Sequence, residues 1–306
     1  MKKKNYSKVL IIILCLFLLT GCTKILKDSD NKPVRNTESG QVLTKNIICK
    51  PTNEKTISIY KENNIDIDSL PSCNKFTPLS NYEGLWTSLF VKPLAWLIIK
   101  IGLILKNYGL ALIATCILIR LILYPFTRKT VMQSEILKQA QPELNRIEKK
   151  YENKTSPEDQ NKKASEMMMV YQKYKINPIS GCILAFIQLP LLLAFYEAIQ
   201  RTPAIFEDKF LFFELGKTPW IAIKDGEYIY LLLVVLIFLA TLFSFRKTLK
   251  DQANNPAMNM QSTLYFMLAI ITYSSFTIAS AVGIYWITSN VFTIIQNLLV
   301  ERKKVK

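Results

Sequence analysis

The chain has 306 residues, 50% of them hydrophobic, and its 39 Lys or Arg outnumber its 23 Asp or Glu to give a formal net charge of +16. Apolar runs of about 20 residues favour a polytopic membrane protein over a large soluble domain. Basic residues lie beside these runs, where topology and anionic lipid account for them, so the charge does not indicate direct nucleic-acid binding. Histidine is absent, and no phosphate-loop or metal motif is present, so we expect no enzyme, cofactor or metal.

Residues 1–21 have the pattern of a secretory signal, with lysines followed by a short apolar run. The run ends in Leu19-Thr20-Gly21-Cys22, which is similar to the lipobox of bacterial lipoproteins. That similarity implies cleavage before Cys22, lipidation of its thiol and an N-terminus outside the cytoplasm. An ordinary signal anchor with an incidental cysteine is the alternative.

Residues 22–83 are polar and have no sustained helical period, which predicts an extracytoplasmic tether or a small, loosely folded module. This segment contains Cys49 and Cys73. Outside the cytoplasm a disulfide between them is chemically allowed, and two free thiols are the alternative. Residues 84–106 then combine leucines and isoleucines three to five residues apart with lysines on other faces, which predicts an interfacial amphipathic helix.

Residues 108–127 form an apolar run long enough to cross a membrane, with Arg120 inside it. An arginine at the centre of a membrane helix costs roughly 2.5 to 3.5 kcal/mol on insertion scales, so it should face water, a partner or a substrate. Our hypothesis is a wet site within the membrane. Snorkelling with local thinning is the alternative, although Arg128, at the end of the span, lies about 12 Å further along the helix.

Residues 130–177 are highly charged and predict a cytoplasmic hairpin of two helices. Ser156-Pro157-Glu158-Asp159 has the pattern of a helix start, with an N-cap, a proline at the first position and acidic residues in the first turn. The run 167–169 is three methionines, which suits either an adaptable surface for apolar substrate segments or packing between the two helices.

Four further apolar segments complete a predicted count of five spans after the signal. The second contains Gln188 and Pro190, whose polar amide and broken backbone ladder suit the wall of a polar cavity or a hydrogen bond between helices. A short basic tail, 301–306, predicts a cytoplasmic C-terminus. The fold class is therefore an all-α polytopic membrane protein with a core at 107–300, and the four later spans lie at about 179–199, 228–245, 263–278 and 281–299.

Four stretches resemble the YidC-type insertases of the YidC/Oxa/Alb family in order and spacing. They are NYGLALIATCILIRLILYPFT from Asn107, QPELNRIEKKY from Gln141, YKINPISGCILAFIQLPLLLAFY from Tyr174 and GIYWITSNVFTIIQN from Gly283. The lipoprotein start and five spans are similar to the Gram-positive form. Residues 23–83 lie outside the resemblance.

The resemblance implies a membrane protein insertase of the bacterial cell membrane that works without covalent chemistry. It implies a hydrophilic groove open to the cytoplasm and to lipid, with Arg120, Gln188 and Trp286 in contact with substrate. Its partners would be nascent membrane proteins and the lipid bilayer, with the Sec translocon and the ribosome as further candidates, and a monomer would suffice. A solute transporter or channel is the rival class, and it predicts paired intramembrane charges or inverted repeats, which we do not find.

Overall fold

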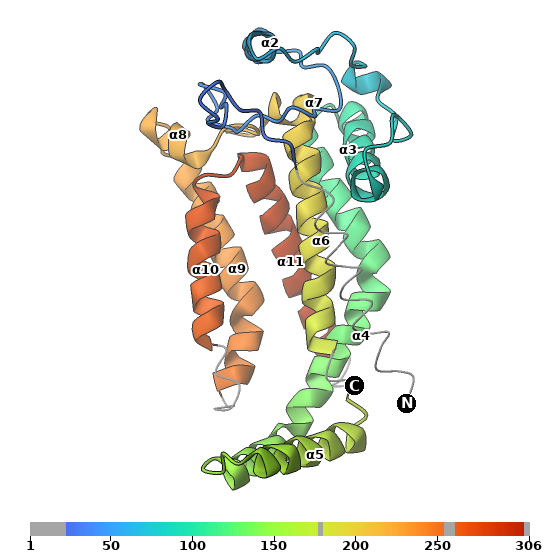
Figure 1. The fold of residues 1–306 in the computed structure, drawn as a ribbon, viewed down its shortest axis with the longest axis vertical. Coiled ribbons are helices and arrows are strands. Elements are labelled where there is room, and N and C mark those ends of the chain that lie inside the picture. The colour runs from blue at the N-terminus through green and yellow to red at the C-terminus, as the bar shows by residue number, and fades with distance from the viewer. Residues whose placement is uncertain (1–22, 177–179, 254–260, 303–306) are drawn as a thin grey trace. The chain divides into compact units, whose positions relative to one another are not determined.

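The computed structural model describes residues 23–176, 180–253 and 261–302 (Figure 1). The described chain is mostly helical, as predicted, and its strands are confined to a small hairpin in a loop. It divides into two compact units: residues up to 117 with 190–237 and 274–288 form the first, and 118–189, 238–273 and the chain from 289 form the second. The predicted signal and Cys22 lie outside the described residues.

The N-terminal segment of the first unit has a hydrophobic core, so of the two alternatives, tether and module, it is the module. Isolated bridges such as Ile25 with Thr44 join its short segments, and one helix, α2 (Glu54–Glu62), begins at Asn53, whose side chain caps the first turn. The apolar residues come from separate short segments, which explains why no helical period was visible. The core residues are Leu26, Leu43, Ile47, Tyr60 and Ile67.

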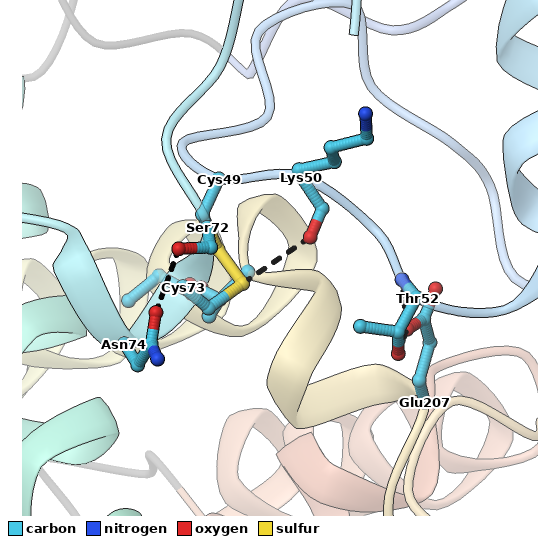
Figure 2. The surroundings of a disulfide bond; sticks show 9 residues. Cys49, Lys50, Thr52, Ser72, Cys73, Asn74 and Glu207 are labelled. Atoms are coloured by element: carbon cyan, nitrogen blue, oxygen red, sulfur yellow. Dashed lines mark hydrogen bonds between the residues drawn. A yellow bond between two sulfur atoms is a disulfide. The ribbon is translucent and has the colours of Figure 1, made fainter. Parts of the chain in front are cut away.

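A disulfide joins Cys49 to Cys73 in this module, with the two Cα atoms 4.9 Å apart (Figure 2). Cys73 begins a short 3₁₀ helix, η1 (Cys73–Lys75). Nearby, the Thr52 N–H and hydroxyl both donate to the Glu207 carboxylate, at 2.8 and 2.6 Å. Of the two states that the sequence left open, the structure therefore has the bridge, and the module also binds the loop that contains Glu207.

The segment predicted as an interfacial helix is helical throughout most of its length. A π-helical turn, η2 (Thr87–Val91), leads into α3 (Lys92–Leu105), which ends where Lys106 adopts a left-handed φ of 52°. By length and composition, Thr87–Leu105 is apolar enough to cross a membrane. Its interfacial position stays a prediction.

Along the chain, several short elements of the first unit connect two long helices, α6 (Ser180–Arg201) and α9 (Tyr230–Ala253). Lys209 pairs with Glu214 and Phe210 with Phe213 in the antiparallel hairpin. Thr218 precedes a proline that starts the last short helix. In chain order these elements are α7 (Pro203–Phe206), β1 (Lys209–Phe210), β2 (Phe213–Glu214) and α8 (Pro219–Lys224).

The predicted first span and the first helix of the predicted hairpin lie in one continuous helix. A single helix, α4 (Tyr108–Tyr151), runs through both despite prolines at 125 and 142, and α5 (Pro157–Lys173) returns beside its end. The N-cap prediction is confirmed, because Ser156 Oγ accepts from the Asp159 N–H at 3.1 Å. The α4–α5 contact centres on Ala140, Leu144, Val170 and Ile176, with Met167 packed against them.

The last two helices are α10 (Gln261–Ser275) and α11 (Ser280–Arg302), joined by a turn of four residues. Within the described chain, only Thr87–Leu105 and Tyr108–Tyr151 are long and apolar enough to count as membrane spans, while Tyr230–Arg246 and Leu264–Ser275 are shorter apolar helices. The predicted count of five spans is thus not decided by helix length and composition.

Candidate functional site

Arg120 lies on α4, inside the second unit, and is only 4% exposed. Its helical neighbours are apolar, with leucine and isoleucine on both sides in the chain. A buried guanidinium among such residues is costly unless it is hydrogen-bonded. Arg120 therefore does not project to the molecular surface, and its partners decide what it can do.

Two polar side chains from other helices bind Arg120. Its Nη2 donates to Gln188 Oε1 on α6 at 2.5 Å and also to the Ser289 hydroxyl on α11. Gln188 Nε2 in turn donates to Ser289 Oγ at 3.3 Å, which closes a triangle. The structure thus brings together two of the predicted site residues and adds Ser289, which we did not predict as a site residue.

One donor of Arg120 remains unused within this arrangement. Arg120 Nε is buried, and none of the described residues accepts a hydrogen bond from it. A buried polar group without a partner loses the hydrogen bonds that it would make in water, so an incoming acceptor would be stabilised there. A carboxylate or a backbone carbonyl has the right chemistry, and a carboxylate would also neutralise the charge.

A second polar contact joins the same two helices seven residues further along each. Gln296 Nε2 on α11 donates to Thr127 Oγ1 on α4 at 2.9 Å, and both residues are buried. Arg120 with Ser289 and Thr127 with Gln296 have the same separation of 169 in the chain. Two equal offsets mean that α4 and α11 run parallel and stay in step over two turns.

Trp286, the third predicted site residue, falls in the first unit. It is half-buried on α11, next to Tyr285, which is buried and stacked on Phe195 with ring centroids 4.2 Å apart. The side chains that accept hydrogen bonds from Arg120 are those of Gln188 and Ser289. A substrate-contacting role for Trp286 stays a prediction.

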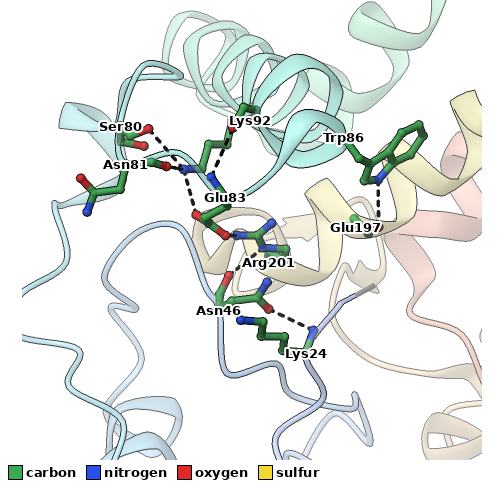
Figure 3. Close-up of polar contacts among 10 residues, drawn as sticks. Lys24, Asn46, Ser80, Asn81, Glu83, Trp86, Lys92, Glu197 and Arg201 are labelled. Carbon is green, nitrogen blue, oxygen red and sulfur yellow. Dashed lines mark hydrogen bonds and ion pairs between the residues drawn. The ribbon is translucent and has the colours of Figure 1, made fainter. Parts of the chain in front are cut away.

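A separate cluster of charges lies in the first unit around Glu83 (Figure 3). The Glu83 carboxylate binds Lys92 Nζ at 2.8 Å and Arg201 Nη2 at 2.6 Å, and both of these basic side chains are almost fully buried. Arg201 Nε also donates to the Asn46 carbonyl at 2.6 Å. This cluster therefore ties the N-terminal module to the ends of α3 and α6.

The two cations govern the acidity of Glu83. Partial burial raises the pKa of this carboxyl, but hydrogen bonds and charge from Lys92 and Arg201 outweigh burial and hold the pKa below its ordinary value. Beside the cluster, Trp86 Nε1 donates to Glu197 at 3.0 Å. All of these contacts are internal to the fold, so we assign the cluster a structural role.

Sequence reasoning overlooked Ser289, Thr127 and Gln296 because each is an ordinary polar residue when viewed singly. A signal was present in α11, where Ser289 and Gln296 are seven residues apart and so lie on one face of the helix. The same spacing separates Arg120 from Thr127. The shared spacing gives each helix a polar face, but it does not show that the two helices are neighbours.

Comparison with known proteins places these residues in a family context. A family model described as 60Kd inner membrane protein matches residues 100–306. A membrane protein insertase YidC from Oceanobacillus iheyensis is 34% identical over 231 residues, covering 72% of this chain and 86% of that protein. The membrane protein insertase MisCA of Bacillus subtilis is 34% identical over 223 residues, covering 72% and 81%.

One solved structure is also similar, described as an active YidC insertase crystal structure with the first transmembrane domain resolved. The TM-score is 0.46 at 18% sequence identity, over 79% of this chain. The chain spans 50% of the length of that protein.

Proposed function

The chain belongs to the 60Kd inner membrane protein family, the YidC-type insertases, and on this premise we propose that it inserts newly made membrane proteins into the lipid bilayer. The observation in this chain that supports the proposal is the buried Arg120, whose Nε donates a hydrogen bond to none of the described residues. Family membership disfavours the rival reading as a solute transporter or channel. No covalent step is required.

Arg120 would act on substrate by electrostatics. A strongly basic group in a poorly solvated setting attracts acidic residues in the soluble end of a substrate. Gln188 and Ser289 hold the guanidinium through Nη2, which leaves Nε to receive a carboxylate or a carbonyl. We propose that water enters around this group during insertion. This water lowers the free-energy cost of moving a polar segment of the substrate part of the way across the membrane.

The driving force would come from the substrate and the membrane. Transfer of a hydrophobic segment into lipid yields about 25 cal/mol per Å² of apolar surface removed from water. The membrane potential adds roughly 2.3 kcal/mol per charge per 100 mV, with the sign that favours outward movement of acidic tails. The protein then needs only to offer a polar path beside lipid, to which we assign Arg120, Gln188 and Trp286.

The membrane arrangement is part of the proposal. We propose five spans at the predicted positions, a lipid anchor at Cys22 outside the cytoplasm, and a cytoplasmic hairpin formed by α5 and the end of α4. Two apolar helices of sufficient length and two shorter ones support the polytopic arrangement. Nascent membrane proteins are the proposed substrates, the Sec translocon and the ribosome are candidate partners, and a monomer would be sufficient.

Depletion of the host insertase and rescue with this chain tests the proposal. Wild type should restore insertion of a membrane protein that depends on a YidC-type insertase, while Arg120→Ala should lose most of the rescue and Arg120→Lys should keep part of it. Ser289→Ala should weaken rescue, because Arg120 and Gln188 both donate to that hydroxyl. Failure of wild type to rescue any such substrate would refute the proposed function.

Site-specific crosslinking examines the path itself. Photoreactive groups at Gln188 and at Trp286 should each capture the hydrophobic segment of an arrested substrate. A matched group at Glu62, exposed on α2 of the N-terminal module, serves as the control and should capture little. Full rescue by Arg120→Ala, with crosslinks retained at both test positions, would leave insertion standing but remove the arginine from its mechanism.

A further inference from the structure

The hairpin between β1 and β2 exposes two large apolar side chains at its tip. Leu211 and Phe212 are 74% and 75% exposed. Leu211 adopts a left-handed backbone with φ 54°, at a position in tight hairpins where glycine is usual. Together the two side chains leave large apolar surface in contact with water, and an apolar environment would remove that surface from water.

The hairpin is fixed to the start of α4. The Tyr108 N–H donates to the Asp208 carboxylate at 2.7 Å, and Asn107 Nδ2 donates to the Lys209 carbonyl at 2.9 Å. Packing is equally close, because a Cβ placed on Gly109 would lie 2.3 Å from Phe210 Cβ. These contacts fix the position of the hairpin that carries the exposed tip.

The start of α9 provides a second attachment. Phe213 is buried and meets the ring of Tyr230 edge-on, with centroids 5.2 Å apart. The Glu214 N–H donates to the Tyr230 hydroxyl at 2.8 Å. The hairpin is thus attached to the starts of α4 and α9, where the apolar sequence of each helix begins.

Large apolar side chains are also exposed at these two helix starts. On α4, which is long and apolar enough to span a membrane, Leu110 is exposed two residues after the start. Immediately before α9, Tyr228 and Ile229 are exposed. Lys106, directly after α3, is also exposed, and a cation there suits anionic headgroups, while the exposed Lys209 pairs with Glu214 at 2.9 Å. The hairpin that carries the apolar tip is thus attached to the starts of two helices that expose further apolar side chains.

We propose that Leu211 and Phe212 form a membrane anchor that inserts into the outer leaflet. This assigns the hairpin a lipid-binding role that is independent of substrate insertion. Among the aromatic residues of this loop, Phe206 and Phe213 are buried and pack inside the fold, Trp220 on α8 is 52% exposed, and Phe212 at the tip is 75% exposed. The partner is the acyl region of the bilayer just below its headgroups.

Photocrosslinking in native membranes tests the lipid contact. A p-benzoylphenylalanine at position 212 keeps an aromatic ring there and adds the photoreactive benzoyl group, and the same residue at position 62 on α2 is the matched control. After irradiation, peptides that contain position 212 should carry phospholipid masses in several-fold excess over peptides that contain position 62. Adducts at 212 mainly with a second copy of the chain, or with another protein, would overturn the proposal.

Fluorescence quenching supplies a second measurement that does not depend on crosslinking chemistry. The full chain with Leu211→Cys is labelled with an environment-sensitive dye and reconstituted into vesicles of phosphatidylcholine and phosphatidylglycerol. A nitroxide placed high on the acyl chain should quench this dye several-fold more strongly than a dye on Glu62→Cys, with unsubstituted chain as the labelling control. Equal quenching at the two positions, with emission typical of water, would refute insertion of the tip.

Discussion

Loss of the Cys49–Cys73 disulfide should greatly increase the opening of the N-terminal module. The two cysteines are 24 residues apart in the chain. In the chain-entropy treatment, closing a loop of that length removes about 12 cal/mol/K from the unfolded state, which is about 3.5 kcal/mol at 25 °C. Since about 1.4 kcal/mol corresponds to a factor of ten, the open fraction should rise by up to about 300-fold.

Limited proteolysis of the full chain in membrane vesicles measures this opening. When opening and closing are fast relative to cleavage, the cleavage rate follows the population of the open form. The double variant Cys49→Ser with Cys73→Ser should be cut within residues 23–82 at a greatly increased rate. Cleavage in the α4–α5 hairpin should stay unchanged, because that hairpin has its own core.

Reductant provides the internal control for this experiment. Wild type treated with dithiothreitol should approach the cleavage rate of the double variant, whereas the double variant should not respond to dithiothreitol. A less than twofold change in cleavage within the module, in both the variant and the reduced protein, would refute the reasoning. It would mean that the hydrophobic core alone keeps the module closed.

Three further substitutions test separate contacts. Glu83→Gln should lower the free energy of unfolding of the first unit, because two buried cations lose their counter-ion. The loss should stay below the roughly 3 to 5 kcal/mol typical of a fully buried pair, because the Glu83 side chain is 36% exposed. Since the folded pKa of Glu83 is lowered, its contribution is present above the ordinary glutamate range and is lost as pH falls through the folded value; thermal melts across acidic pH should show this step in wild type only. Ser156→Ala should destabilise the first turn of α5 by about 1 kcal/mol in hydrogen exchange, while Ser156→Asp keeps the cap. Gln296→Leu should cost about 0.5 to 1.5 kcal/mol and leave rescue of insertion largely intact, unlike Ser289→Ala.

Each of these expectations can fail in a distinct way. A Glu83→Gln variant with the acid profile of wild type would show that other carboxyls produce the step. Equal exchange in Ser156→Ala and Ser156→Asp would mean that contacts within the hairpin core, and not the cap, hold the first turn of α5. Loss of rescue in Gln296→Leu as severe as in Ser289→Ala would indicate that both contacts position Arg120.

The sequence predicted the features that depend on local pattern. Ser156 with Pro157 gave a helix start because capping requires only neighbouring residues, and the structure has that cap. Arg120 was conspicuous because a charge within an apolar run has a high transfer cost. Gln188 stands out because a buried amide needs hydrogen-bond partners, and the structure places it against Arg120.

Features that depend on contacts between distant segments could not be predicted. Ser289 becomes important only through its place opposite Arg120, and a serine in a membrane helix is common. The core of the N-terminal module joins residues from several short segments, so no periodic pattern revealed it. The continuity of α4 past residue 130 was not evident either, because the sequence there changes from apolar to charged and a change in composition does not end a helix.

The equal spacing of the two contacts between α4 and α11 limits how this protein can tolerate insertions and deletions. The contacts of Arg120 with Ser289 and of Thr127 with Gln296 require that the two residues on each helix stay seven positions apart. One residue added between Ser289 and Gln296 would turn the rest of the helix by about 100° and separate one pair from the other. Length changes are therefore tolerable in the connecting loops, whereas within these two stretches only substitutions preserve both contacts.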